Sequence, residues 1–244
     1  MTENAKIALV TGANKGIGRE TAAQLAALGM TVLLGARDAE RGEEAASALR
    51  AAGGDVQAVA LDVTDADVVL AAARAIDERF GRLDILVNNA GITGGHGQAP
   101  TSADLDTVRA VFDTNYFGVM RVTNAMLPLL LRSDAPRIVN LSSSVGSLAE
   151  ASDPAGPLAD LPPSAAYVPS KTALNALTVQ YAKELRKDHV LVNAGCPGYC
   201  ATDLNNHSGY RTAAQGATIA VKLATLGPDG PTGGFFNEDG PVPW

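Results

Sequence analysis

Tyr167 and Lys171 stand four residues apart in a stretch whose composition is typical of a helix. Residues at this spacing project from one helical face, so the phenol and the ammonium group should lie close together. A free tyrosine titrates near pH ~10, and a nearby positive charge favours the phenolate. The pair therefore indicates a proton donor for a carbonyl group that accepts hydride. Because the same spacing is common on solvated helix faces, the rest of the chain has to decide.

A glycine-rich segment follows the first apolar run. It has the pattern Gly-x-x-x-Gly-x-Gly at Gly12, Gly16 and Gly18, between a strand-like run and a helix-like run. Glycines let the backbone approach a pyrophosphate, and the free N–H groups at a helix start favour negative charge. An ordinary tight turn has a similar pattern, but the alternation around it favours a nucleotide site.

The residues after the second apolar run should select the nucleotide. A carboxylate there would bind the ribose 2′-OH of NAD, whereas arginine accommodates the 2′-phosphate of NADP. The sequence has Arg37 at this place, and we expect Lys15 and Arg41 to approach the same phosphate. The alternative is a solvated helix face in which Arg37 pairs with Asp38. The sequence favours NADP over NAD.

The chain that must position these groups alternates between strand-like and helix-like segments. Apolar runs predict strands at 7–10, 31–34, 56–61, 83–87, 137–141, 190–194 and 234–236. Helices are predicted at 19–28, 39–52, 65–80, 105–132, 165–186 and 212–224. Because crossover helices connect parallel strands, we expect an α/β Rossmann fold: a seven-stranded, mostly parallel, doubly wound sheet with helices on both faces. No linker divides the chain, so 1–244 should form a single domain.

Composition excludes several function classes. The net charge of -7 argues against a nucleic-acid or anionic-membrane surface as partner. No apolar run is long enough to span a membrane and the first residues are polar, which predicts a cytoplasmic protein. His96, His189 and His207 have no partners at ligand spacing, so no metal site is expected. Cys196 and Cys200 fit neither a zinc knuckle nor a redox pair, and are predicted to be structural thiols.

Several further motifs agree with one family. They are Asp62-Val63, the Asn-Asn-Ala-Gly element at 88–91, and Cys-Pro-Gly-Tyr-Cys-Ala-Thr-Asp at 196–203. With these motifs the chain resembles the short-chain dehydrogenase/reductase family over nearly its whole length, and most closely the NADPH-dependent carbonyl reductase branch. The resemblance implies an NADP(H) site made of Gly12, Asn14, Lys15, Gly16, Ile17, Gly18, Arg37, Arg41, Asp62, Val63, Asn89, Ala90, Gly91, Pro197, Gly198 and Thr202, together with Tyr167 and Lys171.

The same resemblance implies a catalytic set of Asn115, Ser143, Tyr167 and Lys171. Tyr167 is expected to exchange the proton, and Lys171 to lower the pKa of the tyrosine and bind the nicotinamide ribose. Ser143 would hold the carbonyl oxygen, although its neighbour Ser142 is an alternative at this place. Asn115 would hold a water that connects Lys171 to bulk solvent, or is simply a helix-interior amide bonded to backbone.

The expected function is reduction of a ketone or aldehyde to an alcohol by NADPH. A dehydrogenase of steroids, sugars or secondary alcohols remains an alternative on the same site, and a non-catalytic NADP-binding protein is a less favoured one. The partner is a small carbonyl or alcohol molecule. The sequence leaves open which substrate, which stereochemistry and which direction apply.

Two variable segments depart from the common family pattern. A loop with four prolines at 152–164 lengthens the stretch before Tyr167. The resemblance implies that in some carbonyl reductase relatives such an insertion covers the helix face that other members use to oligomerise, so monomer and homo-oligomer both stay open. Residues 199–215 lie where the family has its substrate lid, with His207 and Tyr210 either contacting substrate or in a solvated loop. Trp244 is expected to pack on the body or on a neighbouring chain.

Overall fold

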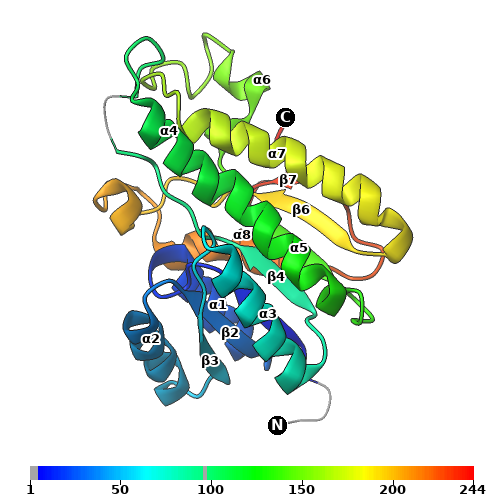
Figure 1. Cartoon of the computed structure of the whole chain (residues 1–244). Coiled ribbons are helices and arrows are strands. Elements are labelled where there is room, and N and C mark those ends of the chain that lie inside the picture. Colours follow the sequence, from blue (N-terminus) through cyan, green and yellow to red (C-terminus); the bar gives the residue numbers. More distant parts are fainter. Residues whose placement is uncertain (1–4, 96–97) are drawn as a thin grey trace.

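A parallel sheet forms the centre of the molecule in the computed structural model, which describes residues 5–95 and 98–244 (Figure 1). Within these residues there are seven strands, in the order β3-β2-β1-β4-β5-β6-β7, and every neighbouring pair is parallel. The strands are β1 (Ile7–Val10), β2 (Thr31–Ala36), β3 (Val56–Ala60), β4 (Ile85–Asn88), β5 (Arg137–Leu141), β6 (Leu191–Gly195) and β7 (Phe235–Phe236). The predicted doubly wound Rossmann fold is confirmed.

Helices cover both faces of the sheet. One face packs against α1 (Gly16–Ala27), α2 (Ala39–Ala51) and α8 (Ala213–Ala224). The other packs against α3 (Ala66–Phe80), α5 (Gly118–Leu130) and α7 (Tyr167–Glu184). Because side chains alternate along a strand, Leu9 enters one core and Val10 the other. Burial on both faces explains why the strands have continuous apolar runs.

The helix predicted at 105–132 contains a π-helical turn. It is divided into α4 (Leu105–Phe112), η1 (Asp113–Phe117) and α5, and backbone angles stay helical through both junctions. The wider turn places Asn115 in the interior. Single π turns inside helices occur mostly at functional sites. The 3.6-residue pattern does not reveal such a turn, so the prediction of one regular helix was wrong in this detail.

Irregular segments gather at the end of the sheet where the strands finish. After β5 come the short helices η2 (Ser144–Gly146) and α6 (Leu148–Ala151), and then turns through the proline-rich segment 152–164. The helix η4 (Asp203–Asn205) lies at the same end, in the loop between β6 and α8. At the opposite end of the sheet, a short helix η3 (Leu185–Asp188) extends α7 and precedes the start of β6. The expected loop at 152–164 therefore has neither strand nor helix.

Trp244 packs on the body of the protein. Its ring stacks on Phe235 with 5.6 Å between the centroids, and its carbonyl accepts a hydrogen bond from the Ala149 N–H at 3.0 Å. Of the two packing partners that the sequence left open, the structure shows the body of the protein itself. No helix in the described part of the chain has both the length and the apolar character needed to cross a bilayer.

Candidate active site

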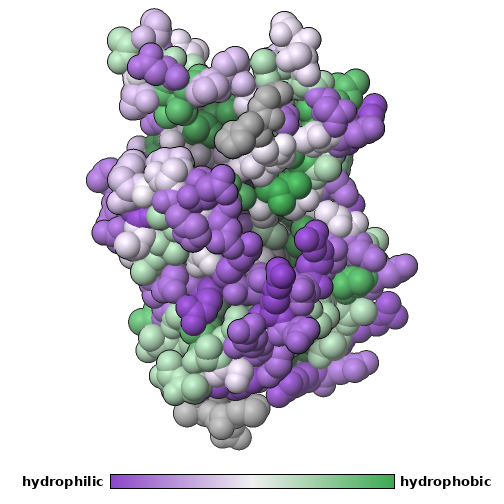
Figure 2. All heavy atoms as spheres, turned by 90° about the vertical axis from the view of Figure 1, so that its left-hand side faces the viewer, coloured by the Kyte–Doolittle hydropathy of each residue, from purple (hydrophilic) through white to green (hydrophobic). Residues whose placement is uncertain are grey.

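A cavity of about 620 Å³ opens at the carboxyl ends of the first four strands. Ligands of doubly wound sheets bind at such a point, where the strand order reverses between β1 and β4. In Figure 2, a face of the molecule shows hydrophobic residues near its middle, between more hydrophilic parts. The lining of the cavity consists of Gly12, Asn14, Lys15, Gly16, Ile17, Gly18, Arg37, Leu61, Asp62, Val63, Thr64, Asn89, Ala90, Gly91, Ile92, Thr93, Gly94, Thr114, Thr202, Asp203 and Leu204.

The glycine loop forms one wall of this cavity. Gly12 and Gly16 have φ of +62° and +56°, a conformation that favours glycine. A Cβ on Gly18 would lie 2.4 Å from Asn89 Nδ2 and 2.6 Å from the Gly12 carbonyl oxygen, so no larger residue fits there. Asn89 Nδ2 donates to the carbonyls of Thr11 and Gly12 at 2.8 and 3.1 Å, which holds the loop against β4.

The start of α1 has the chemistry of an anion site. Its N-cap residue is Lys15, which makes no side-chain capping bond. The Lys15 side chain therefore leaves the first N–H groups of the helix uncapped, and these groups belong to residues that line the cavity. The helix dipole favours negative charge at this end. A pyrophosphate fits this donor set and the space that the glycines leave.

Two charged groups stand in the part of the cavity that lies beyond β2 and β3. Arg37 and Asp62 both line it. Burial raises the pKa of Asp62, but hydrogen bonds from the Thr64 hydroxyl and N–H, with the charges of Arg37 and Arg121, outweigh it and hold that pKa below its ordinary value. The carboxylate is therefore charged at neutral pH and can accept hydrogen bonds from a ligand.

Arg41 does not line the cavity. Its Nε lies 3.5 Å from Asp38 Oδ2 on an exposed turn of α2, and Asp38 also caps that helix. The structure therefore brings Arg37 and Lys15 to the cavity but leaves Arg41 outside it. The solvated pair that the sequence offered as an alternative for Arg37 is formed by Arg41 instead.

Tyr167 lies at the first turn of α7, and Pro169 explains why the helix begins there. Proline lacks an N–H and is best tolerated in the first turn of a helix, where no intrahelical partner is needed. From this position the Tyr167 hydroxyl lies near the Ser143 hydroxyl, close enough for the serine to oppose the rise in the pKa of the phenol. The Lys171 Nζ lies 5.6 Å from the centre of the tyrosine ring.

The neighbouring serine has another task. Ser142 is buried and its Oγ donates to Asn175 Oδ1 at 2.5 Å, while Asn175 Nδ2 donates to the Gly146 carbonyl at 3.2 Å. These bonds attach η2 to α7. Ser143 is the serine that contacts Tyr167, which agrees with the position chosen from the sequence.

Burial shifts the pKa values of the tyrosine and the lysine in opposite directions. It raises the pKa of Tyr167 to about 12, with a further increase from Cys196 and a smaller opposing effect of the Ser143 hydrogen bond. It lowers the pKa of Lys171 to about 8, against the influence of Cys196. The expected lowering of the tyrosine pKa by the lysine is not seen, because desolvation of the phenolate dominates.

Asn115 and Lys171 adjoin the cavity wall at Gly91. A Cβ on Gly91 would lie 3.3 Å from Asn115 Oδ1 and 3.7 Å from Lys171 Nζ. Lys171 Nζ donates to the Leu141 carbonyl at 2.7 Å. The asparagine side chain bonds to both backbone groups of Ile92 at 2.9 Å, and its Nδ2 also donates to Ser170 Oγ at 3.0 Å. The amide thus bonds to backbone, as the structural alternative expected, but to the loop after β4 and not to its own helix.

Comparison with known proteins agrees with this geometry. Residues 6–212 match the family model described as short chain dehydrogenase. The chain belongs to the short-chain dehydrogenase/reductase family. The family predicted from the sequence is thereby confirmed.

Relatives of this family match along nearly their whole lengths. (-)-Isopiperitenone reductase from Mentha piperita is 36% identical and covers 98% of this chain and 98% of its own. The solved structure of salutaridine reductase from Papaver somniferum has a TM-score of 0.82 at 33% identity, covering 96% of this chain and 99% of that one. NADPH-bound carbonyl reductase from chicken fatty liver has a TM-score of 0.86 at 28% identity, covering 99% and 100%.

Not every residue that the family resemblance implies reaches the cavity. Pro197 and Gly198 are not part of its lining, and Gly198 packs with φ of +74° against the Arg211 side chain. Other lining residues were not predicted from the sequence, notably Asp203, which follows Thr202 directly. Asn175 was not predicted either, although it continues the four-residue spacing of Tyr167 and Lys171 along α7. That polar stripe on a buried face was the available signal.

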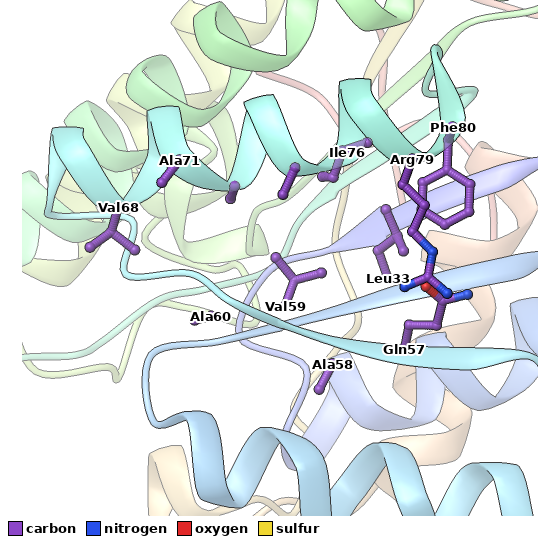
Figure 3. A pocket seen from close by; sticks show the side chains of 12 residues that line it. Leu33, Gln57, Ala58, Val59, Ala60, Val68, Ala71, Ile76, Arg79 and Phe80 are labelled. Atoms are coloured by element: carbon purple, nitrogen blue, oxygen red, sulfur yellow. The ribbon is translucent and has the colours of Figure 1, made fainter.

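A second cavity, of about 490 Å³, lies between β3 and α3 (Figure 3). Its lining is apolar apart from Gln57 and Arg79. The Arg79 guanidinium lies over the Phe80 ring, 5.3 Å from its centre. None of the residues that line this cavity is an acid, histidine, cysteine, tyrosine or lysine.

The thiols and histidines do not form a site for a metal among the described residues. No group of three or more histidines, cysteines or acids is arranged to hold an ion in that part of the chain. His96 lies outside the described residues, and His207 bonds to Asp203 at 2.9 Å. Cys196 and Cys200 are buried and free, and Cys196 Sγ accepts the Ser144 N–H at 3.2 Å.

Proposed function

We propose that this protein is an NADPH-dependent carbonyl reductase that converts a ketone or aldehyde to an alcohol, and that also runs the reverse reaction. The observation that carries the proposal is the contact of Ser143 with Tyr167, beside Lys171 and next to a cavity whose loops suit a dinucleotide. The cofactor of the NADPH-bound carbonyl reductase with the same fold gives further support.

The cofactor site proposed here uses the glycine loop for the pyrophosphate and Arg37 with Lys15 for the 2′-phosphate. Arginine matches the geometry of phosphate oxygens, and both cations line the cavity. Asp62, kept charged by Thr64 and Arg37, would accept a hydrogen bond from the adenine. When bound, the nicotinamide supplies the hydride, which is chemistry that no side chain provides.

Proton transfer is the task of Tyr167 in this proposal. Its raised pKa keeps the phenol protonated at neutral pH, so it is available as a general acid. The Ser143 hydroxyl lies near the phenol hydroxyl, and a carbonyl oxygen placed between the two would accept a hydrogen bond from each. The alkoxide that forms takes the proton of Tyr167, and the same proton returns to Tyr167 in the oxidative direction.

Lys171 and Asn115 would prepare this proton transfer. A protonated Lys171 stabilises the phenolate that forms when Tyr167 gives up its proton. Its bond to the Leu141 carbonyl holds the ammonium group near both the Tyr167 ring and Gly91. Asn115 holds the loop after β4 through Ile92, and we propose that it also keeps a water in reach of Lys171 for proton supply.

The experiment is an assay of NADPH oxidation by absorbance, with a panel of ketones, aldehydes, α-keto esters and quinones. We expect turnover by the wild type, and a loss of at least 100-fold in kcat for Tyr167→Phe, in keeping with the loss of a general acid. The cofactor dissociation constant of that variant should stay near the wild-type value. Wild-type turnover by Tyr167→Phe would refute the assigned acid.

A further inference from the structure

The loop between β6 and α8, which we call the lid (residues 199–211), is tied to the body at its base. The Ala201 N–H donates to the Arg211 carbonyl at 2.8 Å, and the Arg211 N–H donates to the Tyr199 carbonyl at 3.1 Å. The Arg211 guanidinium forms an ion pair with Glu238. The base of the lid is therefore fixed by backbone and side-chain bonds together.

The tip of the lid is tied to the glycine loop by one side chain. Lys15 Nζ donates to Asp203 Oδ2 at 2.7 Å, and His207 Nε2 lies 2.9 Å from Asp203 Oδ1. Hydrogen bonds from both neighbours lower the pKa of the Asp203 carboxyl, Lys15 having the larger effect, so the group is a carboxylate at neutral pH. Among the described residues, the ion pair of Lys15 with Asp203 is the one salt bridge between the lid and this loop.

The position of this ion pair is informative. Lys15 and Asp203 both line the cavity assigned to the cofactor, one from the glycine loop and the other from the lid. Their side chains are also 59% and 52% exposed. A pair that lines the cavity and faces solvent lies at its mouth, so it joins two of its walls where a ligand has to pass.

The local structure of the lid holds Asp203 in this place. The Asn205 side chain bonds to the Thr202 N–H at 3.2 Å and to the Cys200 carbonyl at 2.8 Å, which closes the turn around Asp203. His207, with φ of +59°, lies in the left-handed region that few non-glycine residues adopt. It contacts Asp203 from within the lid, so of these two neighbours of Asp203 only Lys15 belongs to another segment.

We propose that the ion pair of Lys15 with Asp203 is a strap across the mouth of the cofactor cavity, and that its opening sets the rate at which the dinucleotide enters and leaves. The Lys15 ammonium has three N–H donors and uses one of them on Asp203, so it can hold the carboxylate and a 2′-phosphate together. This inference rests on the proposed function, since it takes NADP(H) as the occupant. Lid opening and product release limit turnover in many enzymes. An exposed ion pair contributes little stability, so this one can open without a large cost in free energy.

The test is the rate of NADPH dissociation, measured by stopped-flow fluorescence after displacement with excess NADP⁺. Asp203→Asn removes the charge and should raise this rate about two- to fivefold, the range for loss of an exposed pair. Asp203→Glu keeps a carboxylate and should stay closer to the wild type. Asp106→Asn, which breaks an exposed pair with Arg109 on α4, is the matched control and should change nothing.

Salt gives an independent readout. At ~1 M salt the Debye length is about 3 Å, so the strap should be screened and the rates of wild type and Asp203→Asn should converge. Equal dissociation rates for these two proteins at low salt would overturn the proposal. Tighter NADPH binding by Asp203→Asn, together with unchanged NADH binding, would also overturn the proposal. This result would show that Asp203 competes with the 2′-phosphate for Lys15.

The outcomes separate this inference from the proposed reductase activity. Strap kinetics in a protein that reduces no carbonyl compound would support the strap and refute the activity. Carbonyl reduction with no effect of Asp203→Asn on dissociation would do the reverse.

Discussion

Lys171 is buried and Tyr167 is half-buried where proton transfer is proposed, and the partial loss of water affects the two groups differently. An uncharged phenol is favoured over a phenolate, and an uncharged amine over an ammonium ion. The pKa of the tyrosine therefore rises to about 12 and that of the lysine falls to about 8. Of the two groups, Lys171 is therefore the one whose charge changes closer to neutral pH.

The pH dependence of reduction follows from these directions. Because the pKa of Lys171 is lowered to about 8, the ammonium form is present below this pH and is lost above it. We expect kcat/KM for carbonyl reduction to fall as pH rises through about 8, since the neutral amine no longer stabilises the phenolate. Initial rates at low substrate concentration between pH 6 and ~10 measure this. A flat profile would contradict the role of the lysine charge.

Cofactor choice should depend on Arg37 and much less on Arg41. Charge-assisted hydrogen bonds contribute about 1.5–3 kcal/mol, so Arg37→Ala should weaken NADPH binding roughly 10- to 100-fold and leave NADH binding nearly unchanged. Arg41→Ala is the matched control, because Arg41 lies outside the cavity and pairs with Asp38. Fluorescence titration with both nucleotides measures the effect. A larger loss for Arg41→Ala, or an equal loss for NADH, would contradict the assignment.

Of these two arginines, only Arg37 lines the cavity, although the sequence predicted both there. Arg37 was found because it follows β2 directly, where topology fixes its place. Arg41 lies one helical turn further on, and whether it turned toward the cavity depended on the exposed pair with Asp38. Ser143 contacts Tyr167 and its neighbour bonds to Asn175, a distinction made by long-range contacts that no local pattern contains.

At the scale of elements, the contact of η2 with α7 sets the distance between serine and tyrosine. A Cβ on Gly146 would lie 2.8 Å from the Lys171 carbonyl carbon and 2.9 Å from its Cβ. The two elements therefore touch backbone to backbone. Asn175 strengthens this contact by bonding to both Ser142 and the Gly146 carbonyl.

A methyl group at this contact should impair catalysis and spare cofactor binding. We expect Gly146→Ala to move η2 away from α7 and to lower kcat by at least about tenfold, because a displacement near 1 Å can cost about 100-fold. NADPH binding should persist, since Gly146 does not line the cavity. Gly227→Ala, at a glycine with open space around it, is the control. An unchanged kcat for Gly146→Ala would show that this contact does not position Ser143.

The elements themselves were largely predictable, and the exception has a physical reason. Continuous apolar runs gave the strands to within a few residues, because both faces of the sheet are buried. The π turn η1 was not predictable, since it inserts extra width into a helix without changing its composition. Tertiary contacts favour it: the Asn115 amide finds both backbone groups of Ile92.

For the whole molecule, function depends on bringing distant segments to one edge of the sheet. The glycine loop follows β1, Asp62 follows β3, Ser143 follows β5, and Tyr167 comes from α7. The parallel topology alone places the carboxyl ends of these strands together, which is why the location of the site could be predicted from the order of elements. The lid contacts could not, because Lys15 and Asp203 meet through the conformation of a loop.

The proposed reaction takes place at the carboxyl ends of the strands: hydride passes from NADPH to a carbonyl carbon, and Tyr167 supplies the proton. The most direct measurement uses NADPH deuterated at the transferred position and mass spectrometry of the alcohol formed from each carbonyl of the panel. We expect one deuterium in the product of the wild type, and no detectable product from Tyr167→Phe although that variant binds NADPH. Binding of NADPH by the wild type without label transfer to any carbonyl would contradict it, and would favour a non-catalytic NADP-binding protein.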